Sequence, residues 1–118
     1  MKTSREINQK LIETFPEIRP EIETEISWQD GLDTGSTVVF EDVFVKSVIA
    51  ALHFKNDSYL RRVFRFAEDM LETGDEYAIN VIEVAFIEAI ASYDERDELQ
   101  KYMLPKTLES YQKCKVHF

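Results

Sequence analysis

Two histidines and one cysteine are the residues of this sequence best suited to catalysis or to binding a metal ion. His53 falls near the end of a predicted apolar helix, and Cys114 precedes His117 by three residues. A thiol and an imidazole at this spacing can share a helix face, but two ligands are too few for a structural zinc site. Cysteine catalysis also needs an activated thiol and a group that orients the base. We therefore expect neither a metal centre nor a catalytic pair here.

Glycine-rich motifs for binding phosphates or dinucleotides are missing from the sequence, which has three glycines. Residues 30–41 match part of a calcium-binding loop, since they begin with Asp30, place Gly35 sixth and end with Glu41. The third and ninth positions are Leu32 and Val38, whose side chains carry no oxygen. Because calcium takes about six or more oxygen ligands, we interpret the segment as an acidic loop and expect no cofactor.

Glu83 and Glu88 flank the most apolar segment, and we expect both carboxylates to be partly buried. A buried carboxylate needs a charged or hydrogen-bonding partner, and the basic cluster of Arg61, Arg62 and Arg65 offers candidates. We interpret this as a structural ion pair. The alternative is an enzyme that uses Glu83, Glu88 or a metal at the acidic loop. Since no complete catalytic set is found, we predict that the protein is not an enzyme.

Acidic side chains dominate the sequence, with 23 Asp and Glu against 14 Lys and Arg, for a net charge of −9. Such a charge repels nucleic acid and anionic membranes and steers association toward basic partners. Residues 16–42 carry eight acids and one base, and residues 66–100 carry eleven acids and one base. The alternative interpretation is a solubilising surface without a specific partner.

Two groups of acids are the partner-binding residues that we predict. The first group flanks Gly74 and begins a short helix after residue 93, and the second lies in the N-terminal third. Charge-dominated binding through either group weakens steeply with salt. The residues are Glu72, Asp75, Glu76, Asp94, Glu95, Asp97 and Glu98 in the first group, and Glu21, Glu25, Asp30 and Asp33 in the second.

Length and composition favour one cytoplasmic domain over residues 1–118. The hydrophobic content of 44% is typical of a globular protein with one core. No apolar run reaches the roughly 18 residues of a membrane span. The N-terminus lacks the apolar segment of a signal peptide, and a single cysteine cannot form an internal disulfide.

Hydrophobic residues recur at helical spacing along the chain. Thr3 and Glu6 match a capping box at the start of the first helix. Asp57 or Ser58 is a candidate cap for the fourth helix, and Gly74 is expected to end it in a left-handed conformation. The helices are expected at about residues 3–15, 20–28, 40–54, 57–73, 75–93, 94–103 and 105–114.

The helix expected over residues 75–93 is apolar on most sides, which is typical of a central helix. The connections after residue 54 are short and favour antiparallel neighbours. We therefore predict an all-α fold, a compact bundle of about six to seven helices arranged as antiparallel hairpins around this central helix. A stack of degenerate helical repeats is the alternative.

Five short segments cover most of the chain in order: FPEI at 15–18, FEDVF at 40–44, FRFAEDM at 64–70, VAFIEAI at 84–90 and LPKT at 104–107. Together they resemble a family of uncharacterised small, acidic, all-helical bacterial domains that includes putative polymorphic-toxin immunity proteins. The resemblance implies a cytoplasmic domain that binds a toxin and blocks its active site or the approach of substrate. Many such toxins are basic nucleases, and an acidic face then imitates the nucleic-acid backbone.

The function that we expect is therefore an acidic protein-binding module, an immunity or antitoxin-like protein that neutralises a cognate toxin by direct binding. The toxin is expected to be a basic domain, such as a nuclease. The alternative is a helical adaptor or a regulatory homodimer, joined through an apolar stripe of Val84, Ile87 and Ala91. Neither function involves nucleic acid or a membrane as the binding partner.

Overall fold

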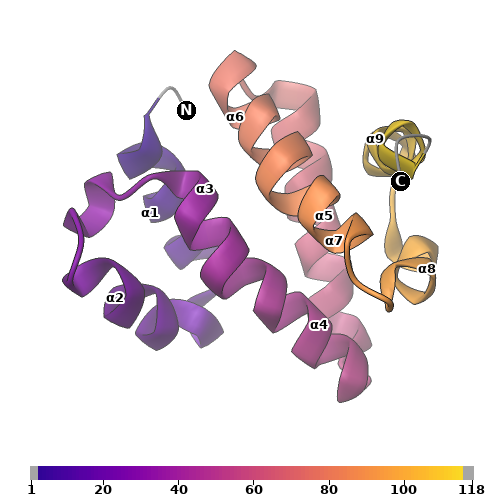
Figure 1. Cartoon of the computed structure of the whole chain (residues 1–118), viewed down its shortest axis with the longest axis horizontal. Helices are drawn as coiled ribbons and strands as arrows, with labels where there is room; N and C mark the ends of the chain where they lie inside the picture. Colours follow the sequence, from indigo (N-terminus) through magenta and orange to yellow (C-terminus); the bar gives the residue numbers. More distant parts are fainter. Residues whose placement is uncertain (1–2, 116–118) are drawn as a thin grey trace.

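Seven helical stretches make up most of residues 3–115, the part of the chain that the computed structural model describes (Figure 1). No β-strand occurs between residues 3 and 115, and the predicted all-α fold is confirmed. The labels α and η mark α-helical turns and 3₁₀ or π-helical turns, respectively. In chain order the elements are α1 (Ser4–Thr14), η1 (Pro16–Ile18), α2 (Arg19–Ser27), η2 (Gly31–Asp33), α3 (Ser36–Val39), η3 (Phe40–Phe44), α4 (Val45–His53), α5 (Asp57–Thr73), α6 (Glu76–Asn80), η4 (Val81–Glu88), α7 (Ala89–Ala91), α8 (Arg96–Leu99), η5 (Gln100–Tyr102) and α9 (Pro105–Lys115).

Side-chain caps begin two helices where the sequence predicts them. The Thr3 hydroxyl accepts a hydrogen bond from the Glu6 N–H at the start of α1, and the Asp75 carboxylate accepts one from the Ala78 N–H at the start of α6. These oxygens satisfy N–H groups that have no carbonyl partner inside the helix. Phe15, the residue before a proline, leaves helical geometry and ends α1 as expected.

One predicted helix start and one predicted cap are wrong. The third helical stretch begins at Ser36 and not at Phe40, because hydrogen bonds to Ser4 and Asn8 hold Ser36 against α1 and the helix follows directly from it. The next helix, α5, is capped by Asn56, which lies just before the predicted candidates. The start at Ser36 depends on contacts with α1, and the cap at Asn56 depends on local cap geometry, neither of which hydrophobic spacing encodes.

The continuous helix of α6, η4 and α7 lies at the centre of the bundle, as predicted. The stretch from α3 to α4 packs on one side of it, and α5 and α9 cover other sides (Figure 1). Ile87 and Ala91 are buried by this packing, whereas Val84 is 40% exposed. The apolar stripe predicted for a homodimer is therefore wrong, since two of its three residues already pack inside the protein.

Aromatic rings from four helical stretches meet in the core. Phe44 stacks on Phe86 with a centroid distance of 5.3 Å, which joins the π-helical turns of η3 and η4. Phe15 and Phe66 also contact Phe44, at 5.0 and 5.9 Å between centroids. Tilted and edge-to-face aromatic pairs add specificity to the burial of apolar area. These contacts fix η3, and the α4 helix that continues it, relative to α1 and α5.

Glu68 is a buried carboxylate of this fold, and the prediction that Glu83 and Glu88 are partly buried is wrong. Both predicted residues are exposed, so their carboxylates are in contact with water and need no buried partner. Glu68 on α5 is 4% exposed and accepts hydrogen bonds from the N–H groups of Lys106 and Thr107, at 2.8 and 2.9 Å. It thus caps α9 from another helix.

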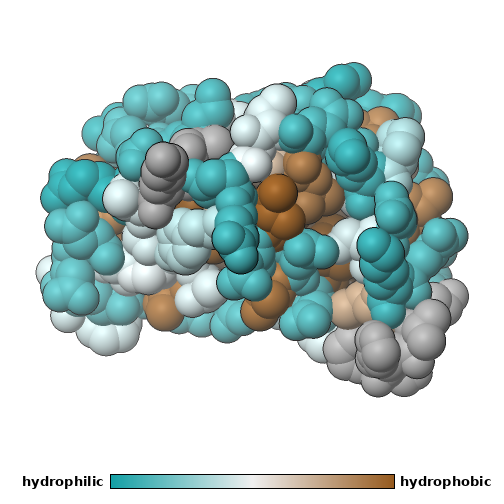
Figure 2. Space-filling view, turned by 90° about the horizontal axis from the view of Figure 1, so that it is seen from above, coloured by the Kyte–Doolittle hydropathy of each residue, from teal (hydrophilic) through white to brown (hydrophobic). Residues whose placement is uncertain are grey.

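The surface is hydrophilic over most of the face shown in Figure 2, with hydrophobic residues visible in smaller patches between hydrophilic areas. Within residues 3–115, three large hydrophobic side chains are exposed: Trp28, Phe54 and Val84. Among the helices described, none combines the length and the apolarity needed to cross a membrane.

Candidate functional site

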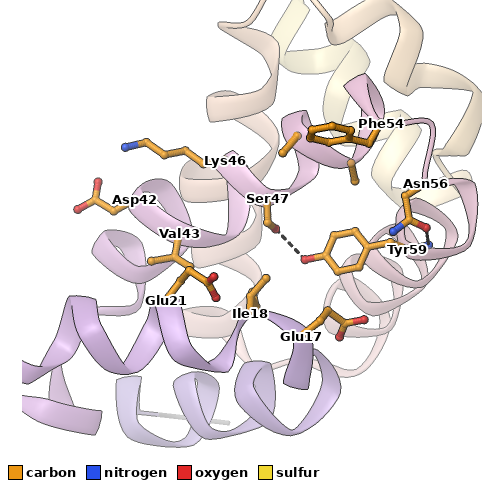
Figure 3. A pocket seen from close by; sticks show the side chains of 12 residues that line it. Glu17, Ile18, Glu21, Asp42, Val43, Lys46, Ser47, Phe54, Asn56 and Tyr59 are labelled. Atoms are coloured by element: carbon orange, nitrogen blue, oxygen red, sulfur yellow. Dashed lines mark hydrogen bonds between the residues drawn. The ribbon is translucent and has the colours of Figure 1, made fainter.

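A hollow of about 500 Å³ opens between η1–α2 on one side and η3–α4 on the other, with the start of α5 at one end (Figure 3). Its apolar floor consists of side chains that continue the core to the surface. Ile18, Val43 and Ala51 are buried there, and the ring of Tyr59 lies beside them. The full lining is Glu17, Ile18, Glu21, Asp42, Val43, Lys46, Ser47, Ala50, Ala51, Phe54, Asn56 and Tyr59.

A second, shallower hollow continues the first one along α2. The two share Glu21, Asp42 and Val43, so they form one groove between α2 and η3–α4, which we call the α2–α4 groove. Trp28 lines one end of it and Phe54 the other. These side chains are 71% and 85% exposed. An apolar groove that ends in large exposed apolar side chains is a candidate site for binding a protein or a ligand.

Carboxylates line both walls of the α2–α4 groove. Glu17, Glu21 and Glu25 stand on the η1–α2 wall, and Asp42 stands on the η3 wall beside the one cation of the lining, Lys46. In Figure 3, Asp42 and Lys46 point outward from the upper wall, and Glu17 and Glu21 come from the lower one. The apolar floor is thus bordered by four acids and one base.

Arg62 forms an ion pair with Glu17 on the side of the η1–α2 wall that faces away from the α2–α4 groove. Its guanidinium donates to both Glu17 carboxylate oxygens, at 2.6 and 3.2 Å, and to the Thr14 carbonyl at 2.7 Å. The hydrogen bond from Arg62 lowers the pKa of Glu17 below its usual 4.5. Glu17 therefore stays ionised at neutral pH in a fixed position at the edge of the groove.

Tyr59 and Ser47 form a hydrogen-bonded pair inside the groove, 2.7 Å apart (Figure 3). The Ser47 hydroxyl donates to the Phe44 carbonyl at 2.6 Å, so the Tyr59 hydroxyl is the donor to Ser47. Burial raises the pKa of Tyr59 to about 12, and the bond to Ser47 only partly offsets it. Tyr59 is therefore a neutral structural donor at physiological pH.

Comparison with known protein families assigns this chain to one of them. The model described as "Domain of unknown function (DUF7674)" matches residues 8–118. The chain belongs to this family. The match covers both walls of the α2–α4 groove and confirms the resemblance to an uncharacterised domain family. No curated protein and no solved structure gives a significant match.

The first group of predicted acids in this DUF7674 domain splits into two separate clusters. The helix from α6 to α7 stands between them, and its sixteen residues span roughly 20 Å. Asp75 caps this helix, Asp97 accepts from the Tyr111 hydroxyl, and Glu95 lies 3.2 Å from His53. One end of the helix carries Glu72, Asp75 and Glu76, and the other end is followed by Asp94, Glu95, Asp97 and Glu98.

The second predicted group contributes two residues to the groove. Glu21 and Glu25 line its α2 wall, whereas Asp33 is 2.9 Å from Arg5 in an ion pair and Asp30 lies in the loop after α2. Sequence reasoning missed four groove residues: Glu17, Asp42, Trp28 and Phe54. Glu17 belongs to the same four-residue row as Glu21 and Glu25, and both aromatics follow the last residue of a helix, outside its apolar stripe.

Cys114 and His53 do not line the α2–α4 groove. Cys114 is buried on α9, and burial raises the pKa of its thiol. His53 is exposed at the end of α4, and His117 lies outside the described residues. Between residues 3 and 115, no three His, Cys, Asp or Glu side chains are grouped so that they could hold a metal ion.

Proposed function

We propose that this protein binds a basic, amphipathic segment of a partner protein in the α2–α4 groove. The observation that carries the proposal is the placement of two exposed aromatic side chains, Trp28 and Phe54, at opposite ends of an apolar groove with acidic walls. Binding energy at protein interfaces is concentrated in a few residues, and tryptophan and other large apolar anchors are prominent among them.

The charges of the groove select the chemistry of the partner. Apart from Glu17, which is paired with Arg62, three carboxylates and Lys46 line the groove. This excess of acid favours a segment with lysine or arginine on both flanks of an apolar stripe. The net charge of −9 steers such a segment toward the domain from a distance and speeds association. Both effects weaken as salt shortens the range of the field.

The shape of the groove favours a helix as the docked segment. The wall from Asp42 to Phe54 spans twelve residue steps of nearly continuous helix, or roughly 18 Å. A partner helix of about three turns fits beside it and places apolar side chains at positions i, i+3 or i+4 and i+7 on the floor. Basic residues next to this stripe then reach Glu21 and Asp42 on the two walls.

The biological role that we propose for this binding is neutralisation of a toxin, as in immunity proteins. Two of the segments that carry the family resemblance, residues 15–18 and 40–44, contribute the groove residues Glu17, Ile18, Asp42 and Val43. An acidic groove suits a basic nuclease, whose substrate is a polyanion. Occupation of such a toxin's nucleic-acid surface by this domain stops substrate from binding.

Affinity capture with matched variants tests the proposal. The tagged protein and its Trp28→Ala/Phe54→Ala variant are used to capture partners from a lysate of the source organism, at low and high salt. Val84→Ala, at the third exposed large hydrophobic, is the control. We expect a basic protein that the double variant loses and that Val84→Ala keeps. A captured protein that all three bind equally is evidence against the α2–α4 groove.

Charge reversals then identify the acidic surface in use. Glu21→Lys/Asp42→Lys in the groove is compared with Glu72→Lys/Glu76→Lys, at the end of α5 and the start of α6, which changes the net charge equally. We expect affinity for the captured protein to fall at least tenfold in the first variant and less than twofold in the second.

Coexpression of the captured protein tests the proposed role in immunity. A partner that stops growth, and whose effect is prevented by wild type but not by the groove variant, supports immunity. A harmless partner supports the adaptor alternative.

A further inference from the structure

A second groove, of opposite charge, lies between the C-terminal half of α1 and the middle of α5. It encloses about 530 Å³, and we call it the α1–α5 groove. Its floor is formed by Phe66 and Met70, which are 5% and 2% exposed. The full lining is Lys10, Thr14, Arg62, Arg65, Phe66, Asp69, Met70 and Thr73.

The lining of the α1–α5 groove is basic in a strongly acidic chain. It contains three cations and one acid, Asp69, although the chain carries a net charge of −9. Arg62 is occupied by Glu17, but Lys10 and Arg65 form no ion pair with any residue from 3 to 115. Two cations on facing helices are thus available to a ligand.

The basic cluster of Arg61, Arg62 and Arg65 forms no ion pair with Glu83 or Glu88, the partners expected from the sequence. Arg62 does neutralise Glu17, and Arg61 lies over the ring of Tyr102 at 6.0 Å from its centroid. Arg65 lies on the same helix and lines the groove, and it forms no ion pair with any residue from 3 to 115. The Glu17–Arg62 ion pair lies between the two grooves, since Glu17 lines the α2–α4 groove and Arg62 lines the α1–α5 groove.

The two threonine hydroxyl groups that line the α1–α5 groove are not available as donors to an anion. Thr14 donates to the Lys10 carbonyl and Thr73 to the Asp69 carbonyl, both at 2.7 Å. Their protons are therefore used inside their own helices. The ammonium group of Lys10 and the guanidinium of Arg65 remain as the donors that a carboxylate can reach.

We infer that the α1–α5 groove binds an acidic segment of a protein partner. Carboxylates of that segment pair with Lys10 on α1 and Arg65 on α5, and an apolar side chain between them covers the floor at Phe66 and Met70. A polypeptide fits better than a small anion, because a lone phosphate leaves the apolar floor uncovered. The net charge of −9 opposes docking to an anionic membrane. This inference does not depend on the occupant of the α2–α4 groove.

A labelled peptide tests the inference directly. The probe is a capped, fluorescein-labelled peptide with three glutamates on each side of a Leu-Phe pair, and binding to the full chain is followed by fluorescence anisotropy at low ionic strength. The variant is Lys10→Glu/Arg65→Glu. The matched control is Lys46→Glu/Lys55→Glu, which changes the net charge equally at other exposed sites. Circular dichroism establishes that each variant is folded.

We expect the Lys10/Arg65 variant to weaken peptide affinity at least tenfold and the control to weaken it less than twofold. In methyl NMR spectra, the Met70 signal should shift when the peptide is added and the Met103 signal should not. Trp28→Ala/Phe54→Ala should leave peptide affinity unchanged, which separates this site from the α2–α4 groove.

Three results would overturn the inference. The first is the absence of peptide binding at low ionic strength. The second is equal weakening by the two charge-reversal variants, which shows that only net charge matters. The third is displacement of the peptide by inorganic phosphate, but not by chloride at equal ionic strength, which identifies a small-anion site in place of a docking groove.

Discussion

The Arg62 guanidinium binds both oxygens of the Glu17 carboxylate, at 2.6 and 3.2 Å, and stands on the ridge between two grooves of opposite charge. The same guanidinium lies 5.2 Å from the centroid of the Phe15 ring, so it also covers the edge of the aromatic core. The ion pair neutralises one acid of the α2–α4 groove and one cation of the α1–α5 groove at the edge that the two grooves share. The remaining charges of each groove, acidic in one and basic in the other, lie away from this edge.

Replacement of Glu17 by glutamine should make stability less dependent on acid. The folded-state pKa of Glu17 is lowered by its bond to Arg62, so its contribution is complete above the unfolded value of 4.5 and is lost as pH falls through the folded pKa. Because both side chains are 43% exposed, we expect Glu17→Gln to cost about 0.5 kcal/mol or less at pH 7. Urea unfolding at pH 7 and below pH 3 measures this, and the cost should vanish in acid. Glu13→Gln serves as the control, and a cost that is the same at both pH values contradicts the assignment.

Tyr59 should make the fold sensitive to alkali. Its pKa rises from 10.0 to about 12 in the folded state because it is buried, so the unfolded chain loses this proton first. Stability is then complete below pH 10 and falls as pH rises toward 12. Between pH 9 and 11, the wild type should lose about 1 kcal/mol more than Tyr59→Phe. Urea unfolding at both pH values tests this, and identical losses would show that the Tyr59 hydroxyl is accessible to water.

Local sequence signals predict most of the helices of this fold. Apolar residues at four-residue spacing and the caps at Thr3 and Asp75 depend on neighbours in sequence, and the structure confirms them. The start of α3 depends instead on Ser36, which is held by α1 from 28 or more residues away. Contacts of that range leave no periodic signal, so the predicted start was four residues late.

Of the candidate site, only the acidic residues of the η1–α2 wall could be predicted from the sequence. The row of Glu17, Glu21 and Glu25 is visible in the sequence because it repeats every four residues. Asp42 comes from η3, and its position opposite this row follows from the aromatic contacts of Phe44 in the core. The groove itself is a product of how two helices pack, which the hydrophobic pattern of each helix alone does not specify.

Gly74 should be intolerant of substitution because of close packing rather than a left-handed conformation. The expected left-handed cap is wrong: Gly74 has φ −73° and ψ 157°, in the extended region. A Cβ atom there would lie 2.3 Å from the Met70 carbonyl oxygen, which is backbone and cannot rotate away. We expect Gly74→Ala to cost about 1 to 3 kcal/mol in urea unfolding. Gly35→Ala is the matched control, since its nearest neighbour would be Thr37 Oγ1 at 3.9 Å. Equal stability of the two variants would argue against the close contact.

Glu68 should contribute to stability through the start of α9. Its two carboxylate oxygens accept the N–H groups of Lys106 and Thr107, and the side chain is nearly inaccessible to water. Glutamine places an amide NH₂ against one of these donors, so we expect Glu68→Gln to lower the free energy of unfolding by about 1 to 3 kcal/mol. Asp69→Asn, the same change at the exposed neighbour, should stay within about 0.5 kcal/mol of wild type. Hydrogen exchange locates the effect within the structure. We expect the first amides of α9 to exchange faster in Glu68→Gln, because they lose their acceptor. Unchanged exchange at these amides would assign the loss of stability to α5 instead.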